Sequence, residues 1–108
     1  MNVDITIAGK ELTVLLSGEI DHHTAGKMRE TIDGEIERHR PSKTKLDFSG
    51  VSFMDSSGIG LIMGRFRLMR LIGGELKVVN VPGSLQRMVK LSGISSLGVL
   101  SEERSVKA

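Results

Sequence analysis

The alternation of hydrophobic and polar residues predicts two strands at the start of the chain. Residues 3–7 (VDITI) alternate weakly, and every second side chain of residues 11–17 (ELTVLLS) is apolar. A repeat of two residues places these side chains on one face of a strand. A Gly-Lys pair at positions 9–10 indicates a tight turn between the two segments. We therefore expect the chain to open with a β-hairpin.

The next apolar positions have the spacing of a helix. They are Ala25, Met28, Ile32 and Ile36. This spacing places them on one helical stripe. Asp21 or Thr24 can cap the start of the helix, and Pro41 stops it.

A longer helix is expected over residues 57–72, ended by a Gly-Gly pair. Its predicted buried stripe consists of Ile59, Ile62, Met63, Phe66 and Met69, and the arginines at 65, 67 and 70 lie off this stripe. Gly60 and Gly64 are four residues apart on one helix face. Their spacing favours close packing of the helix on a sheet over a dinucleotide-binding motif.

The remaining segments complete an alternation of strands and helices. Residues 43–48, 75–81 and 97–100 are predicted strands, and a short helix begins at Pro82. The polar alternation of 43–48 indicates a sheet with one solvent-exposed face. Right-handed crossovers between neighbouring strands then place the helices on the other face. The sequence predicts one α/β domain over residues 1–108, with a core of about 3–100, a mostly parallel sheet, and a polar tail at 101–108.

Composition narrows the possible functions. The 108 residues suffice for one core, and the lack of cysteine excludes a disulfide framework. Aromatic residues make up only 3%, which disfavours stacking on single-stranded nucleic acid. We see no long apolar run and no secretory signal pattern. We therefore expect a cytoplasmic protein without cofactor, metal, nucleic-acid partner or membrane contact.

The net charge of +2 is unevenly distributed. Residues 1–55 carry 10 acidic and 7 basic side chains, whereas residues 56–108 carry 3 acidic and 8 basic ones. This asymmetry is typical of a solvated surface, and it also fits a basic face for an acidic partner or a phosphate.

Two loops follow the carboxyl ends of predicted parallel strands, where functional residues gather in such sheets. They are residues 18–24 and 49–58. The second loop contains Asp55, Ser56, Ser57 and Gly58. This pattern indicates a capped helix, and a serine at a helix start is also a good place to carry a phosphate.

The first loop contains His22 and His23 beside Asp21. A metal site needs three or four ligands, and only His39 remains to add to these histidines. A phosphohistidine or a general base is a further interpretation, and an exposed loop is the simplest one.

A serine hydrolase is a third possibility for these two loops. Its nucleophile would be Ser56 or Ser57, its base His22 or His23, and its acid Asp21, Asp47 or Asp55. The nucleophile motif G-x-S-x-G is absent around these serines. We therefore expect a protein that is not an enzyme.

Two segments carry a resemblance to a known family. Residues 18–25 (GEIDHHTA) and 46–65 (LDFSGVSFMDSSGIGLIMGR) resemble the anti-sigma factor antagonists with a STAS domain, and in particular their sporulation branch. The resemblance spans roughly residues 3–105. It implies a STAS fold, in which strands and helices wind as a superhelix with the helices mainly on one face of the sheet.

The resemblance also implies a function. Family members are non-enzymatic switches. The unphosphorylated form binds an anti-sigma factor that is also a serine kinase, SpoIIAB-like in the sporulation branch, and this binding releases sigma F. Phosphorylation ends the binding, and a SpoIIE-type phosphatase reverses the phosphorylation. A generic STAS module that senses a small ligand or nucleotide is the alternative.

The same resemblance implies roles for individual residues. By motif position, Ser56 is the phosphate acceptor, Asp21 contributes to partner recognition, and Ser57 is the helix-capping neighbour of Ser56. The implied partner-binding surface consists of Asp21, His22, His23, Asp55, Ser56, Ser57, Gly58, Ile59 and Leu61. We expect this protein to be a monomer.

Overall fold

The strands pair in the order in which they occur along the chain. The computed structural model describes residues 2–101, and within them five strands form one sheet in the order β1-β2-β3-β4-β5. The strands are β1 (Val3–Ala8), β2 (Glu11–Ile20), β3 (Lys43–Met54), β4 (Glu75–Val79) and β5 (Leu100–Ser101). β1 and β2 are antiparallel, and the other neighbouring pairs are parallel. The opening hairpin and the mostly parallel sheet are confirmed.

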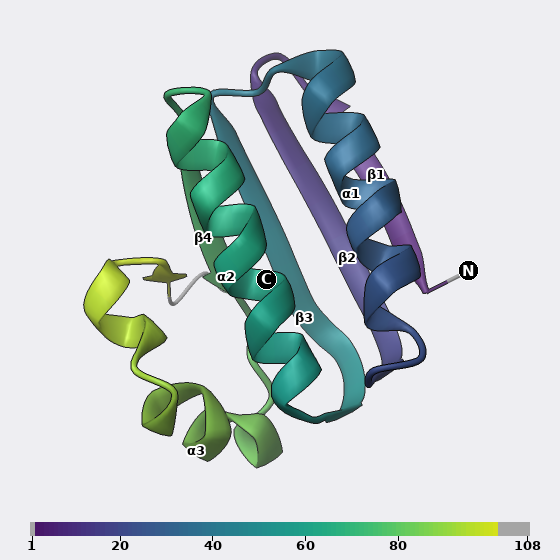
Figure 1. Ribbon diagram of the computed structural model, residues 1–108, viewed down its shortest axis with the longest axis vertical. Coiled ribbons are helices and arrows are strands. Elements are labelled where there is room, and N and C mark those ends of the chain that lie inside the picture. Colours follow the sequence, from purple (N-terminus) through teal and green to yellow (C-terminus); the bar gives the residue numbers. More distant parts are fainter. Residues whose placement is uncertain (1, 102–108) are drawn as a thin grey trace, which may run out of the picture.

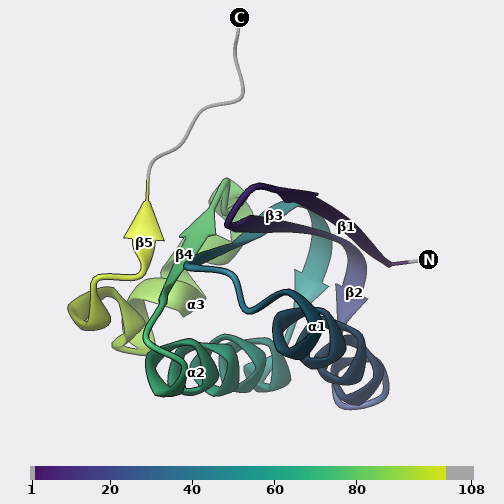
Figure 2. The same cartoon turned by 90° about the horizontal axis from the view of Figure 1, so that it is seen from above.

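Two long helices cover one face of this sheet. Helices α1 (Ala25–His39) and α2 (Ser56–Leu71) lie side by side in front of the strands in Figure 1, and Figure 2 shows them as a separate layer. Helix α3 (Gly83–Leu91) lies near the end of β4. It begins one residue later than predicted, because Pro82 is its N-cap and not its first helical residue. The predicted arrangement of helices is thus confirmed for α1 and α2.

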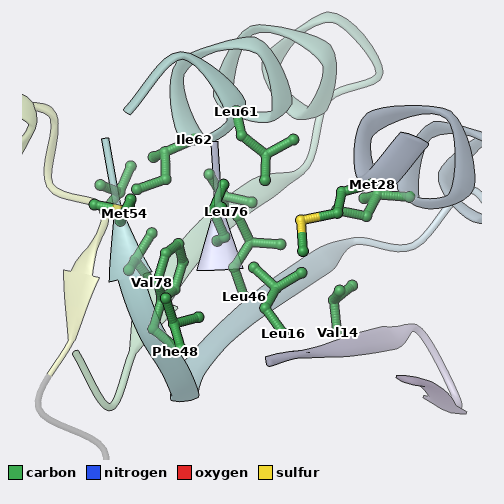
Figure 3. Packing of buried hydrophobic residues seen from close by; sticks show 14 of the residues in the cluster. Val14, Leu16, Met28, Leu46, Phe48, Met54, Leu61, Ile62, Leu76 and Val78 are labelled. Atoms are coloured by element: carbon green, nitrogen blue, oxygen red, sulfur yellow. The ribbon is translucent and has the colours of Figure 1, made fainter. Parts of the chain in front are cut away.

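The core lies between the sheet and these helices. Alternate residues of the central strands, such as Leu16, Leu46 and Phe48, are fully buried and point toward α1 and α2 (Figure 3). The opposite face of the sheet carries charged side chains, and there Lys45 Nζ lies 3.1 Å from Glu11 Oε2. The predicted sheet with one solvent-exposed face is confirmed.

Strand β3 continues six residues beyond the predicted end at position 48. The register passes from Leu15–Asp47 to Ser17–Gly50, so β3 advances by one residue more than β2, and a second shift follows before Phe53. Each shift leaves one extra residue on β3, as a β-bulge does, and breaks the repeat of two. At Gly50 a side chain would lie 2.9 Å from the Leu16 carbonyl oxygen. The prediction of a loop over residues 49–58 was therefore wrong for residues 49–54, which belong to β3, and for residues 56–58, which belong to α2.

The C-terminal segment also differs from the prediction. β4 ends at Val79, a 3₁₀ helix (Ile94–Leu97) occupies the start of the expected last strand, and β5 consists of Leu100 and Ser101 alone. Residues 102–108 of the predicted tail lie outside the described residues.

Arg65 is buried, contrary to the prediction that it lies off the buried stripe. It is 6% exposed, and its Nε lies 2.7 Å from Asp33 Oδ1 on α1. The contact is an ion pair between α2 and α1. Arg65 Nη1 donates to the Leu61 carbonyl oxygen at 3.3 Å. This cation thus links the two helices and replaces part of the expected apolar stripe.

The apolar stripe of α2 is rotated relative to the prediction. Ile62 and Met69 are buried as expected, whereas the other three predicted members are only partly buried: Ile59, Met63 and Phe66. Gly60 and Gly64 face away from the core, because a Cβ atom at either position would meet nothing within 4 Å. Their expected packing on the sheet was wrong. The glycine that packs closely is Gly58, where a Cβ atom would overlap the Met54 side chain.

The glycines of α2 allow a matched test of this packing. We expect Gly58→Ala to lower the free energy of unfolding by about 1–3 kcal/mol, because Met54 must move. Gly60→Ala should raise it by about 1 kcal/mol, because alanine favours the helix and meets no neighbour. Urea denaturation of the two variants measures both values. Equal effects of the same sign would contradict the assigned helix orientation.

The Arg65–Asp33 pair should make stability depend on pH. Burial raises the pKa of the Asp33 carboxyl, and the charge of Arg65 opposes this rise. Arg65→Met removes the charge that lowers the Asp33 pKa and leaves the half-buried Asp33 carboxylate without this ion pair. We expect the free energy of unfolding at pH 7 to fall by about 2 kcal/mol. At acidic pH the Asp33 carboxyl is protonated and uncharged, so we expect a smaller difference in the free energy of unfolding between the wild type and Arg65→Met. Urea denaturation at pH 7 and pH 4 checks this, and a difference that stays constant would refute the pairing.

Candidate functional site

The parallel pairing of β2 and β3 brings the two candidate loops together. The last paired residues are Ile20 and Met54, and the Asp55 N–H donates to the Ile20 carbonyl oxygen at 3.1 Å. Asp21 and Asp55 therefore follow directly on neighbouring strands. Both helix starts lie at the same end of the sheet, the lower end in Figure 1. The predicted juxtaposition of the loops is confirmed.

Asp21 organises the turn before α1. Its Oδ1 accepts hydrogen bonds from the backbone N–H groups of His23 (2.8 Å) and Thr24 (3.1 Å). The His23 N–H is the main cause that holds the pKa of Asp21 below its ordinary value, with help from Thr24. Thr24 is the N-cap residue of α1 by position, but its side chain makes no capping bond; its hydroxyl donates to the Glu19 carbonyl oxygen at 2.9 Å. Asp21 is thus a charged side chain fixed in one orientation.

Asp55 is the N-cap of α2. Its Oδ1 accepts the Ser57 N–H at 2.8 Å, and its carbonyl oxygen accepts the Gly58 N–H at 2.9 Å. The Ser57 N–H is therefore the group that is capped, and Asp55 is the cap. The family resemblance implied that Ser57 itself would be the capping residue, and this was wrong. A carboxylate is a strong cap here, because it satisfies free N–H groups and faces the positive end of the helix dipole.

Ser56 is the exposed first residue of α2. Among residues 2–101, no hydrogen bond engages the Ser56 hydroxyl. Its oxygen is therefore open to an external enzyme, and a group attached to it would project into solvent at the helix start.

The two histidines form an exposed pair beside Asp21. The ring centroids of His22 and His23 are 4.0 Å apart, and His23 Nδ1 lies 3.9 Å from Asp21 Oδ1. In the described part of the chain, neither ring bonds to Ser56 or Ser57. Asp47, the other acid considered for a hydrolase, accepts the Ser49 N–H and the Asn80 amide instead. Residues 2–101 also contain no group of three or more metal-ligating side chains that could hold a metal ion.

Not every predicted surface residue lies on the surface. Gly58 is buried against Met54, and Leu61 is 3% exposed within the core, so the Leu61 side chain is not available to a partner. Ile59 is partly buried.

The sequence analysis missed two residues at this edge. Phe53 is 50% exposed and pairs with exposed Glu19 in the register of β2 and β3. Phe53 precedes the buried Met54, so it points to the opposite face of the sheet. The two bulges hid this position, because they interrupt the alternation that would have assigned it.

No helix within residues 2–101 is long and apolar enough to cross a membrane.

At the sheet edge that carries the two loops, the exposed Ser56 lies among acidic side chains, which are Glu19, Asp21 and Asp55. The arrangement offers a hydroxyl, a fixed carboxylate and an aromatic ring to a partner.

Comparison with known proteins gives consistent matches. The family model for the STAS domain matches residues 2–104. The chain is 41% identical over 83 residues to an anti-sigma F factor antagonist of Paenibacillus polymyxa, covering 77% of this chain and 71% of that protein. It is 30% identical over 97 residues to an anti-sigma-B factor antagonist of Bacillus subtilis, covering 90% and 87%.

Solved structures extend the comparison. The fold superposes on the unphosphorylated form of the anti-sigma factor antagonist SpoIIAA with a TM-score of 0.82 at 25% identity, covering 95% of this chain and 89% of that one. The phosphorylated form of SpoIIAA gives a TM-score of 0.75, also at 25% identity, with coverage of 95% and 92%. The five-stranded sheet, the two helix starts at its edge and the match over residues 2–104 together show that this chain belongs to the STAS-domain family.

Proposed function

We propose that this protein is an anti-sigma factor antagonist that is switched by phosphorylation of Ser56. The observation that carries the proposal is the exposed, unbonded Ser56 at the start of α2, beside the fixed carboxylate of Asp21. The names of the relatives described above support the same function. The active form is the unphosphorylated one, and the protein acts as a binding surface and a kinase substrate, not as an enzyme.

The proposed partner is an anti-sigma factor with serine kinase activity, SpoIIAB-like, and binding releases the sporulation sigma factor, sigma F. The greater identity to the anti-sigma F antagonist than to the anti-sigma-B antagonist favours sigma F. A SpoIIE-type phosphatase would restore the active form. We further propose that the whole chain is one STAS domain that works as a cytoplasmic monomer.

The structure suggests why phosphorylation would spare the fold. A phosphoserine carries a charge of about −2, and the N-terminus of a helix favours negative charge. The hydroxyl of Ser56 takes part in no bond that the modification would break. The fold of the domain should therefore survive the modification.

The interface should respond differently. The phosphate would join the carboxylates of Asp21 and Asp55, and a partner surface fitted to the small, neutral Ser56 hydroxyl would have to accommodate and desolvate an additional dianion. Each tenfold loss of affinity needs only about 1.4 kcal/mol, so a few unfavourable contacts suffice for a switch.

The revised partner-binding surface consists of Asp21, His22, His23, Phe53, Asp55, Ser56 and Ser57, with the exposed part of Ile59. Leu61 is omitted because it is buried, and Gly58 serves to seat the helix.

The assignment of Ser56 is tested with the cognate kinase and ATP. We expect one phosphate on the wild type, none on Ser56→Ala, and one on the matched control Ser57→Ala. Mass spectrometry of tryptic peptides locates the phosphate. Modification of Ser57 in the wild type, or of neither serine, would refute the proposal.

The effect of the charge is tested with Ser56→Asp. We expect this variant to lose at least tenfold in affinity for the kinase partner and to keep a melting temperature within a few degrees of the wild type. Calorimetric titration and thermal unfolding measure the two properties, with exposed Ser84→Asp on α3 as a control for charge alone. Unfolding of Ser56→Asp would show that the phosphate acts through the fold and would contradict the proposed mechanism.

The role of Asp21 is tested by separating its charge from its hydrogen bonds. Asp21→Asn keeps an oxygen that accepts the two turn N–H groups, but it removes the charge. We expect affinity for the partner to fall about tenfold while thermal stability changes little. Asp4→Asn, at an exposed position of β1, is the matched control. Unchanged affinity in Asp21→Asn would restrict Asp21 to a structural role.

A further inference from the structure

A pocket lies between the start of β1 and the first turns of α1. Its volume is about 340 Å³, within the range of small-molecule sites. Figure 1 shows the start of β1 beside the first turns of α1. The pocket is separate from Ser56, which is not among its lining residues.

The inner wall of the pocket is apolar and buried. Val3 and Met28 line it, and they are 7% and 3% exposed. The neighbouring Asn2 is anchored, because its carbonyl oxygen accepts the Ser17 N–H at 3.0 Å. A wall held by a strand and a helix is already formed before any ligand arrives, which lowers the entropic cost of binding.

The rim of the pocket carries a cation. Lys27, on the first turn of α1, lies there together with the ring of His23 from the preceding turn. Lys27 makes no ion pair with any residue of 2–101. Asp21, the carboxylate of the turn before α1, already uses Oδ1 to accept the N–H groups of His23 and Thr24. An unpaired ammonium group beside an apolar wall is complementary to an anion with a short hydrocarbon body.

We propose that this pocket binds a small amphiphilic monocarboxylate. Its carboxylate pairs with Lys27 Nζ and contacts the His23 ring, and its hydrocarbon lies against Val3 and Met28. Thr31, one turn further along α1 than Lys27, also lines the pocket.

The position of the pocket gives the ligand a regulatory role, and this consequence rests on the proposed function. His23 and Thr24 line the pocket, and the N–H groups of the same two residues hold the Asp21 carboxylate. His23 also belongs to the proposed partner-binding surface, so a ligand that displaces the His23 ring would alter that surface. The ligand and the partner protein would then each change the affinity of the other by the same factor.

The binding itself is tested with hexanoate and the isolated protein, in the absence of any partner. We expect saturable shifts of backbone amide NMR signals around Val3, Thr24 and Met28, with a dissociation constant on the order of 1 mM for so small a ligand. Lys27→Ala should weaken binding about tenfold, Lys27→Arg should retain it, and Thr31→Leu should block it by filling the pocket. Lys90→Ala on α3 is the control and should bind as the wild type does.

Three outcomes would overturn the proposal: shifts that do not saturate, shifts centred outside the pocket, and equal affinities for hexanoate and hexanol. The last outcome would show that Lys27 contributes nothing. Because no partner protein is present, these outcomes are independent of the phosphorylation test on Ser56. If hexanoate binds but does not alter affinity for the kinase partner, the site stands and the regulatory consequence fails.

Discussion

The site depends on the register between β2 and β3 at their carboxyl ends. Ile20 and Met54 end the two strands as direct partners, and the Asp55 N–H donates to the Ile20 carbonyl oxygen. β3 is longer than β2 over the same span, and its two bulges take up the extra residues, so that both strands end in register. Without them, Asp55 and Ser56 would be displaced along the edge relative to Asp21. The pairing of two strands thus places two loops that are more than thirty residues apart in the sequence.

The same edge shows how a charged site can be kept rigid. Asp21 and Asp55 each accept backbone N–H groups that would otherwise lack a partner at a helix start or a turn. Both carboxylates are therefore held by the main chain before any partner arrives. A partner that recognises them need not order them first, which favours affinity. The Ser56 hydroxyl, in contrast, makes no hydrogen bond within the described residues, and this difference suits a residue that is to be modified.

The sequence was sufficient to predict the strand order, the covered face and the meeting of the two loops, because these follow from periodicity and crossover rules. It was not sufficient where a contact between distant residues decides the outcome. Arg65 looked like a surface cation, and only its proximity to Asp33 on another helix explains its burial. Gly60 and Gly64 looked like packing positions from their spacing, although the packed glycine is Gly58. In each case the missing information was the rotation of α2 about its axis.

That rotation also explains why the phosphate acceptor is exposed. Gly58 faces Met54 and Ile20, because only a residue without a side chain fits between α2 and the ends of the two strands. Successive residues of a helix are about 100° apart, so Ser56, two positions earlier, lies about 200° away and faces solvent. Ile62 and Met69 lie on the same side as Gly58 and hold the helix in this orientation. Gly58, the last residue of the Asp-Ser-Ser-Gly sequence, thus sets the orientation of α2 that exposes Ser56. The packing of Gly58 and the accessibility of Ser56 for modification are two consequences of this one helix orientation.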